Sequence, residues 1–264
     1  MECSTGHGEV VESPVLEVTG LCKAYGGLTV CDRVDLQLLP GELHALIGPN
    51  GAGKTTLLNL ISGLLTPDSG RIRFLGRDIT SQPLHHPDRQ GMARSFQITS
   101  VFPGFTVQEN IALAVQVRAG NSFSFWRNTA ADPDLQEPAT EIMERIGLAA
   151  RRGVRAADLS HGEQRQLEIA MALALRPRLL LLDEPMAGLG PGGTRKLTDL
   201  IETLKGEMTI FLVEHDMDAV FSLADRISVL VQGTVAACGD PASIRRDTRV
   251  REAYLGGTER AAAD

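Results

Sequence analysis

Phosphate binding is the first chemistry that the residue types and their spacing predict. Residues 48–55 read GPNGAGKT and fit the pattern G-x-x-x-x-G-K-[S/T]. In such a loop the backbone N–H groups surround phosphate oxygens, the lysine reaches the β and γ phosphates, and the hydroxyl ligates Mg²⁺. A chance match in a chain of this length is expected on the order of once in a hundred. The loop therefore predicts a nucleoside triphosphate site in which Lys54 and Thr55 are the functional side chains.

Two acidic residues end a strongly apolar segment further along the chain, where residues 178–185 read RLLLLDEP. At the end of a buried strand, Asp183 would lie beside Mg²⁺ and Glu184 would act as general base toward the attacking water. By itself, such an acidic pair is an ordinary solvated strand end. Together with the phosphate loop, it predicts a nucleotide hydrolase.

A third motif combines helix capping with phosphate chemistry, in residues 159–170 (LSHGEQRQLEIA). Ser160 and Glu163 have the spacing of a capping box that starts a helix. Capping does not require Gly162, which at the second helical position would let a phosphate approach the exposed N–H groups. We expect one face of this helix to meet the core through Leu167, Ala170, Met171, Ala174 and Leu175.

An alternation of strands and helices must position these groups. The pattern of residues 14–25, 28–38 and 71–76 is typical of antiparallel strands. Continuous apolar runs at 179–185 and 209–216 indicate strands that are buried on both faces.

Helices are predicted after the phosphate loop and in the middle of the chain. The strand at 42–48 leads into a helix that Pro67 should stop, with Leu57, Leu60, Ile61, Leu64 and Leu65 on one face. The period is helical from about 105 to 175, apart from a polar, proline-marked stretch near 119–138. Residues 226–239 read as two strands joined by a turn, and the whole is an α/β core with a helical insert.

Length and composition exclude several classes of protein. The 264 residues are 43% hydrophobic and 22% charged, which predicts a globular chain with a core. A formal charge of −7 and only 4% aromatic residues argue against a nucleic-acid partner and against direct binding to anionic lipid. No stretch approaches the ~20 apolar residues of a membrane span, and the N-terminus lacks the layout of a signal peptide. Any membrane role is therefore expected to come through a partner.

The ordered motifs resemble the nucleotide-binding subunit of an ATP-binding cassette (ABC) transporter. This resemblance implies a P-loop NTPase (RecA-like) α/β core, an antiparallel β subdomain and an inserted α-helical subdomain. The implied domain spans 14–256, with its core at 14–97 and 166–256 and the helical subdomain at about 98–165. It also implies ATP as substrate and Mg²⁺ as cofactor.

In that family, residues 159–164 match a signature that contacts the γ phosphate of ATP bound to the opposite subunit. His161 replaces a glycine of the signature, and we expect its side chain not to face the phosphate. Gly190 stands where the family usually has Asp or Asn in a loop that crosses the dimer interface. That departure puts the coupling between the two sites in doubt.

Three further positions match the family one by one. Tyr25 resembles the aromatic that stacks on adenine, Gln97 the glutamine that senses Mg²⁺ and the attacking water, and His215 the histidine at the γ phosphate. Without the resemblance they would be an edge-strand tyrosine, a surface glutamine and a core histidine. The predicted nucleotide contacts are Tyr25, Gly48, Pro49, Asn50, Gly51, Ala52, Gly53, Lys54, Thr55, Thr56, Ser160, Gly162 and Glu163. The predicted catalytic residues are Glu184, His215, Gln97 and Lys54, and the predicted Mg²⁺ ligands are Thr55, Gln97 and Asp183.

Residues 24–36, 159–173, 212–230 and 250–256 resemble the ATPases of branched-chain amino acid importers. This implies transmembrane permease subunits, a second ABC ATPase subunit in a homodimer or heterodimer, and indirectly a periplasmic or extracellular solute-binding protein. It also implies a peripheral position on the cytoplasmic face of the plasma (inner) membrane. Urea, short amides and aromatic acids stay open as solutes, because other subunits select the solute.

Two other classes of ABC protein are considered. Soluble ABC ATPases usually carry two cassettes, a long coiled coil or a basic surface, and this sequence has none of these features. A regulatory cassette that binds ATP without hydrolysis is disfavoured by Glu184 and His215.

Aromatic residues in the helical insert leave a choice between packing and partner contact. Thr106 and Glu109 form a second capping-box pattern, preceded by Phe102 and Phe105. Local packing is the simpler explanation, yet in the resembled family this segment lines the groove that receives the coupling helix of the permease. The segment around Trp126 (121–128) is predicted equally to pack under a loop or to form a partner surface.

Overall fold

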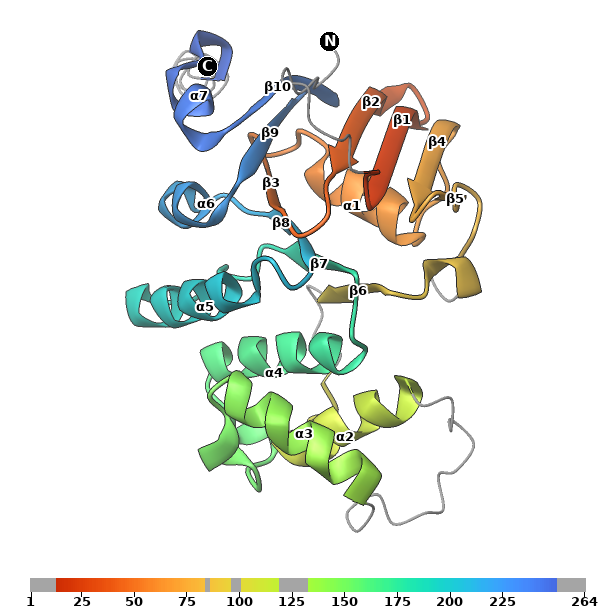
Figure 1. Ribbon diagram of the computed structural model, residues 1–264. Helices are drawn as coiled ribbons and strands as arrows, with labels where there is room; N and C mark the ends of the chain where they lie inside the picture. Colours follow the sequence, from red (N-terminus) through yellow and green to blue (C-terminus); the bar gives the residue numbers. More distant parts are fainter. Residues whose placement is uncertain (1–12, 84–85, 96–100, 119–132, 251–264) are drawn as a thin grey trace.

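A six-stranded sheet forms the centre of the protein (Figure 1). The computed structural model describes residues 13–83, 86–95, 101–118 and 133–250. The strand order is β10-β9-β3-β8-β7-β6, in which β10 is antiparallel to β9 and the other neighbours are parallel. The strands are β3 (Leu43–Ile47), β6 (Met92–Ser95), β7 (Leu179–Asp183), β8 (Thr209–Val213), β9 (Arg226–Val231) and β10 (Thr234–Gly239).

A second, antiparallel sheet has the order β2-β1-β4-β5. It contains β1 (Leu16–Tyr25), β2 (Leu28–Leu38), β4 (Ser69–Phe74) and β5 (Arg77–Asp78). The antiparallel strands and the β9–β10 hairpin predicted from the sequence are confirmed. Every residue of β7 and β8 is buried, as their continuous apolar runs predicted, and every residue of β3 is buried as well.

Seven α-helices are described. They are α1 (Lys54–Ser62), α2 (Val107–Arg118), α3 (Pro133–Arg145), α4 (His161–Ala174), α5 (Pro191–Leu204), α6 (Met217–Leu223) and α7 (Pro241–Arg246). Within the described ranges, every helix is too short or too polar to span a bilayer.

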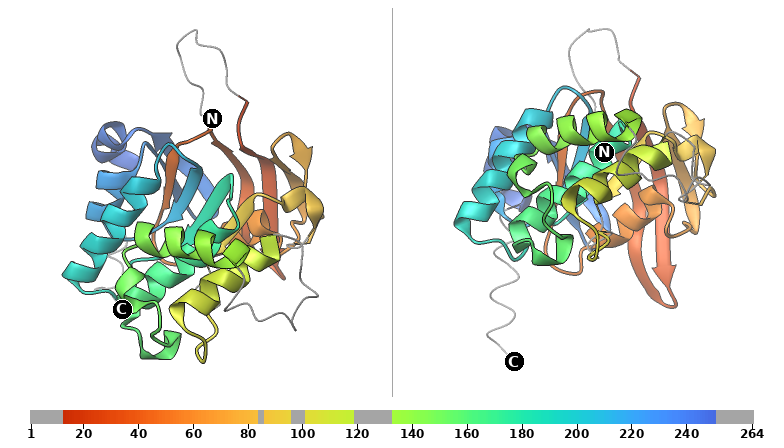
Figure 2. Two further views of the ribbon diagram at one scale, coloured as in Figure 1. Left: turned by 60° about the horizontal axis from the view of Figure 1, so that its bottom comes forward. Right: turned by 90° about the horizontal axis from the view of Figure 1, so that it is seen from below.

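The central sheet has a separate hydrophobic core on each face. Side chains of α2, α3, α4 and α5 pack on one face with Leu180 and Leu182 of β7. Side chains of α1 and of the antiparallel sheet pack on the other face with Leu179 and Leu181. The strand's alternation thus places α1 and α4 on opposite sides of the central sheet, an arrangement that Figures 1 and 2 also show.

The first helix ends earlier than predicted. It stops at Ser62 because Gly63 adopts a left-handed conformation (φ 80°) and caps it, with N–H bonds to carbonyls of the last turn. The expectation that Pro67 stops the helix was therefore wrong. Leu64 lies beyond the helix and is exposed, so it does not belong to the apolar face predicted for it.

Two expectations in the helical region were also wrong. A break in the helices was expected near 119–138, but α3 begins at Pro133 and contains Pro138, while 119–132 lie outside the described residues. Pro138 lies in the interior of this 13-residue helix, where a proline removes one backbone hydrogen bond. Leu175 is the exposed C-cap of α4 rather than a core residue. The proposed boundary between residues 165 and 166 falls inside α4, and that division stays a prediction.

Candidate functional site

Three loops meet at the carboxyl edge of the central sheet. Because β3, β8 and β7 are parallel neighbours, their C-terminal ends lie side by side. These strands lead into the phosphate loop, the segment beginning at Glu214 and the segment beginning at Glu184. Ligands of open parallel sheets bind at this edge.

Two glycines are required by the backbone path of the phosphate loop. A Cβ added at Gly48 would lie 2.2 Å from the carbonyl oxygen of Leu230. Gly53 has φ 102°, and its Cβ would lie 2.5 Å from the carbonyl oxygen of Val30. Side chains at these positions would push the loop off the sheet. The loop is therefore a preformed concave backbone of the type that binds phosphate.

The first turn of α1 offers backbone donors next to this loop. Gly53 occupies the N-cap position and no side chain caps the helix there. Thr55 is exposed and Thr56 is half-buried, so the Thr55 hydroxyl is accessible at the helix start. Unfilled N–H groups and the helix dipole favour an anion at this point.

Lys54 lies folded over the phosphate loop. Its Nζ donates hydrogen bonds to the carbonyl oxygens of Gly48 (2.7 Å) and Pro49 (3.1 Å). Burial lowers the pKa of this ammonium, while the charges of Glu184 and Asp183 oppose the shift. The predicted phosphate ligand and the predicted acidic pair are therefore close enough to interact electrostatically.

Asp183 forms a buried ion pair that the sequence did not reveal. Its Oδ2 accepts a hydrogen bond from Arg94 at 2.9 Å, and both side chains are almost fully buried. Arg94 also donates to Asn59 Oδ1 (2.7 Å) and to Ser62 Oγ (2.9 Å). The guanidinium of Arg94 thus connects β6 to the end of β7, where Asp183 lies, and to α1.

The other oxygen of Asp183 fits a role at a hydrated cation. Asp183 Oδ1 is buried and has no hydrogen-bond partner among the described residues. Such an orphaned carboxylate oxygen is costly unless a ligand or water completes it. Among the described residues, no group of three or more His, Cys, Asp or Glu side chains is arranged to hold a metal alone. A cation here would take its other ligands from Thr55, water and phosphate, as Mg²⁺ usually does.

Glu184 has a strained backbone at the point where catalysis is predicted. Its φ is +46°, a left-handed conformation that is uncommon for a residue with a side chain. Its N–H donates to the carbonyl oxygen of Val213 at 2.8 Å. Strain of this kind persists only where the surroundings determine it, and it is concentrated at functional sites.

Glu214 is a buried carboxylate between the Glu184 and His215 segments, and sequence reasoning missed it. The residue has 0% exposure. Its Oε1 accepts from the N–H of Met186 (2.8 Å), and its Oε2 accepts from the N–H groups of His215 (2.8 Å) and Asp216 (3.2 Å). The side chain of His215 is 59% exposed, with Nδ1 at 3.6 Å from Glu214 Oε2.

The predicted capping box at the start of α4 is confirmed. Ser160 is the N-cap, Glu163 N–H donates to its Oγ, and the Glu163 carboxylate accepts from the Ser160 N–H at 2.9 Å. The pKa of the Glu163 carboxyl is held below its usual range. The main cause is the hydrogen bond from the Ser160 N–H, and the Arg151 guanidinium and the Ser160 hydroxyl also lower it. The ring of His161 lies against the position of Gly188, so it faces the segment after β7.

The other predicted residues lie in different surroundings. Tyr25 ends β1 and is half exposed, with Lys23 Nζ 5.8 Å from its ring centroid. β1 pairs with β4 only as far as Cys22, so at Tyr25 the strand partner is Leu28 of β2. Gln97 and Trp126 lie outside the described residues. Phe102 and Phe105 are exposed and stacked, with centroids 5.5 Å apart.

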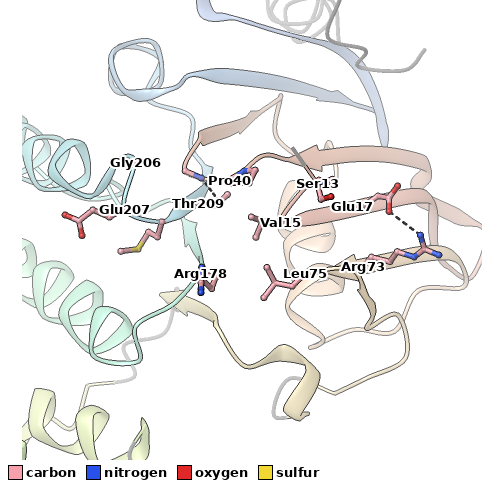
Figure 3. Close-up of a pocket in the computed structure, with 14 residues that line it drawn as sticks. Ser13, Val15, Glu17, Pro40, Arg73, Leu75, Arg178, Gly206, Glu207 and Thr209 are labelled. Carbon is pink, nitrogen blue, oxygen red and sulfur yellow. Dashed lines mark hydrogen bonds and ion pairs between the residues drawn. The ribbon is translucent and has the colours of Figure 1, made fainter. Parts of the chain in front are cut away.

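A hollow of about 720 Å³ lies at the opposite edge of the sheet (Figure 3). It is lined by Gly41 before β3, Arg178 before β7 and Thr209 at the start of β8. Val15 and Leu75, beside the antiparallel sheet, are also among its lining residues. The amino ends of the strands therefore border this hollow, and it is not the phosphate site.

Comparison with known sequences identifies ATP-binding relatives, in agreement with the phosphate-binding geometry of the site. The family model for ABC transporters matches residues 31–187, and that for branched-chain amino acid ATP-binding cassette transporters matches 234–260. The high-affinity branched-chain amino acid transport ATP-binding protein LivG of Escherichia coli strain K12 is 39% identical over 253 residues. The match covers 93% of this chain and 99% of LivG.

Solved structures have the same fold. The ADP conformation of MJ1267, an ATP-binding cassette of an ABC transporter, has a TM-score of 0.81 and 29% identity, over 92% of this chain and 99% of that one. The dimeric ATP-binding cassette MJ0796, in a post-hydrolysis state with ADP and Pi, has a TM-score of 0.71 and 25% identity. The match covers 86% of this chain and 98% of the MJ0796 chain. The α/β fold of a P-loop NTPase predicted from the sequence is thereby confirmed. This chain belongs to the ABC transporter family, as one of its ATPase subunits.

Proposed function

We propose that this chain hydrolyses ATP at sites formed jointly by two cassettes, the phosphate loop coming from one and the signature from the other. Hydrolysis there would power the import of branched-chain amino acids through partner permeases. The observation that carries the proposal is the meeting of Lys54, the acidic pair and the His215 segment at one sheet edge. The match to LivG and to the branched-chain family model supports the solute class.

The phosphate loop would hold the triphosphate of ATP. Lys54 would exchange its two carbonyl partners for β- and γ-phosphate oxygens, which keeps its ammonium hydrogen-bonded in both states. Thr55, Asp183 and Gln97 would hold Mg²⁺, which neutralises phosphate charge when it is bound. Arg94 fixes Asp183 by one oxygen, leaving Oδ1 to face the cation's water shell.

Glu184 and His215 would act at the γ phosphate. Glu184 would accept a proton from the attacking water, as a positioned general base. His215, largely exposed at the same edge, would contact a γ-phosphate oxygen. Tyr25 would stack on adenine, since its ring is half exposed at the end of β1.

The signature would act on the nucleotide of a second cassette. In this chain α4 lies on the face of the central sheet opposite to α1. Ser160, Gly162 and Glu163 start α4, so they would meet a phosphate presented by another subunit. The dimeric state of the similar cassette MJ0796 supports this arrangement.

The proposed location is peripheral, on the cytoplasmic face of the plasma membrane. Transmembrane permease subunits would hold two cassettes together, and a periplasmic or extracellular solute-binding protein would deliver the solute to them. The stacked, exposed rings of Phe102 and Phe105 support a permease contact at the helical subdomain.

Reconstitution with the permeases separates the parts of this proposal. Glu184→Gln should retain ATP binding while turnover falls by about 10²- to 10⁴-fold, because only the base is lost. With ATP and the solute-binding protein, the reconstituted transporter should import leucine, isoleucine or valine. Turnover of Glu184→Gln within a few fold of the wild type would contradict the role of Glu184. Transport of urea, short amides or aromatic acids instead would contradict the solute.

A further inference from the structure

One buried carboxylate connects the two segments that carry the candidate base and the candidate γ-phosphate contact. Oε1 of Glu214 holds the N–H of Met186, two residues after Glu184. Oε2 holds the N–H groups of His215 and Asp216. The side chain therefore spans the gap between the ends of the neighbouring strands β7 and β8.

The chemistry of these contacts requires a carboxylate. All three hydrogen-bonding partners are donors, and they approach both oxygens. An ionised carboxyl group accepts at both oxygens, whereas the amide of an isosteric glutamine accepts at one end and donates at the other. In Glu214→Gln, one of the two segments would therefore face its N–H against an NH₂ group.

The placement is unusual for a purely structural acid. Glu214 has 0% exposure, and its partners among the described residues are backbone N–H groups and the His215 ring at 3.6 Å rather than a Lys or Arg. A buried charge without a cation is expensive, and hydrogen bonds from N–H groups compensate it only in a fixed geometry.

The same geometry fixes the segment of the candidate base from two sides. The Glu184 N–H is bound by the carbonyl oxygen of Val213, and the Met186 N–H is bound by the next residue, Glu214. The left-handed Glu184 backbone, at φ +46°, lies between these two anchors. A carboxylate that holds Met186 thus holds the strained residue two positions before it.

We infer that Glu214 is a positioning residue that holds the Glu184 and His215 segments in one arrangement toward the γ phosphate. It acts through these two residues and has no direct contact with nucleotide. Its loss would slow hydrolysis while leaving nucleotide affinity nearly unchanged, since Lys54 and the phosphate loop are intact. This inference rests on the proposed function of Glu184 and His215.

Glu42 provides a matched control. It is also a largely buried glutamate, with hydrogen-bond partners at the Leu39 N–H (2.7 Å), His44 and Arg226. It directly precedes β3, so it lies at the edge of the central sheet opposite to the phosphate loop. All three partners use Oε1, so a glutamine can keep its oxygen there. Glu42→Gln therefore removes a buried charge without touching the catalytic edge.

The test combines amide hydrogen exchange with steady-state kinetics on the full chain. In Glu214→Gln without nucleotide, exchange at Met186, His215 and Asp216 should rise at least tenfold. With ATP, kcat should fall about 10- to 100-fold, the range seen when contacts that orient catalytic groups are lost, and KM should change less than threefold. Glu42→Gln should change none of these values by more than about threefold.

A double-mutant cycle tests whether Glu214 acts through His215. The combined loss of kcat in Glu214→Gln with His215→Ala should be smaller than the product of the two single losses. Multiplicative losses would overturn the inference, as would unchanged exchange or an unchanged kcat in Glu214→Gln. If that variant does not fold, Glu214→Asp takes its place, since the shorter carboxylate cannot reach both segments. A folded Glu214→Asp with wild-type kcat would overturn the inference.

Failure of the proposed function gives a different result. A wild-type chain that does not hydrolyse ATP contradicts the proposed function. The exchange measurement then still decides whether Glu214 holds the two segments together.

Discussion

Arg94 and Asp183 form an ion pair at 2.9 Å in which both side chains are buried, between the end of β6 and the end of β7. Removing one partner of such a pair leaves an uncompensated buried charge, which typically costs about 3–5 kcal/mol. We therefore expect Arg94→Ala to lower the free energy of unfolding in urea by about that amount.

The control is an exposed pair in the same protein. Arg77 and Asp88 are 3.0 Å apart, and the Arg77 side chain is 71% exposed. Arg77→Ala should cost no more than about 1 kcal/mol because water screens the pair. An Arg94→Ala variant that is as stable as Arg77→Ala would contradict the importance of the buried pair.

The free energy of unfolding should depend on pH through the carboxyl group of Glu163, which belongs to the capping box at the signature. The pKa of its carboxyl is lowered in the folded protein, so the capping box stabilises the fold above the ordinary value of 4.5. This contribution is lost as the pH falls through the lowered, folded value. Glu163→Gln should therefore be less stable than the wild type near neutral pH, by a margin that shrinks below about pH 4.5. A margin that stays constant on acidification would disagree with this account.

Much of the site could be predicted because its motifs are local. The phosphate loop, the acidic pair and the capping box each occupy a few consecutive residues, and their spacing alone fixes which groups lie together. The confirmed Ser160–Glu163 box is one example. The end of α1 shows the limit of this reasoning. The sequence predicted that Pro67 would end the helix, but the helix ends at Ser62, because Gly63 adopts a left-handed backbone conformation and caps it.

Arg94 and Glu214 could not be predicted because their partners are remote. Arg94 meets Asp183 across 89 positions, and Glu214 meets Met186 across 28. Both contacts depend on the order β3-β8-β7-β6, which long-range strand pairing establishes. For Glu214 a signal was present, since this charged residue directly follows the apolar strand β8, whereas Arg94 lies within the short strand β6, which is not apolar. Sequence spacing could not show which neighbour that strand would have.

Tyr25→Ala should weaken ATP binding without slowing the chemical step. Stacking on a base contributes about 1–3 kcal/mol, which corresponds to a loss of about 5- to 150-fold in affinity. Equilibrium titration and single-turnover hydrolysis measure the two effects separately. Leu28→Ala, at an exposed position on the adjoining strand, is the control and should bind ATP normally. Unchanged affinity in Tyr25→Ala would remove Tyr25 from the site.

Gly190→Asp should alter cooperativity and leave the fold intact. Gly190 has φ −74°, and a Cβ there would meet nothing within 4 Å. It is also the uncapped N-cap of α5, where aspartate is favoured by a few tenths of a kcal/mol. A new polar group toward the second subunit should change the coupling between sites by about 1 kcal/mol or more, visible as a changed Hill coefficient. Gly190→Ala controls for the backbone, and identical ATP titrations of Gly190→Asp and wild type would refute the effect.

Complementation between two inactive variants tests the composite site most directly. Lys54→Ala removes the phosphate-loop lysine, and Ser160→Arg blocks the signature, so each variant alone should form dimers without a complete site. A mixed dimer retains one complete site, made from the phosphate loop of the Ser160→Arg chain and the signature of the Lys54→Ala chain. The ATPase rate of an equimolar mixture, measured where gel filtration with ATP shows dimers, should therefore be restored in part. An inactive mixture of dimers, or wild-type turnover by Ser160→Arg alone, would contradict the account.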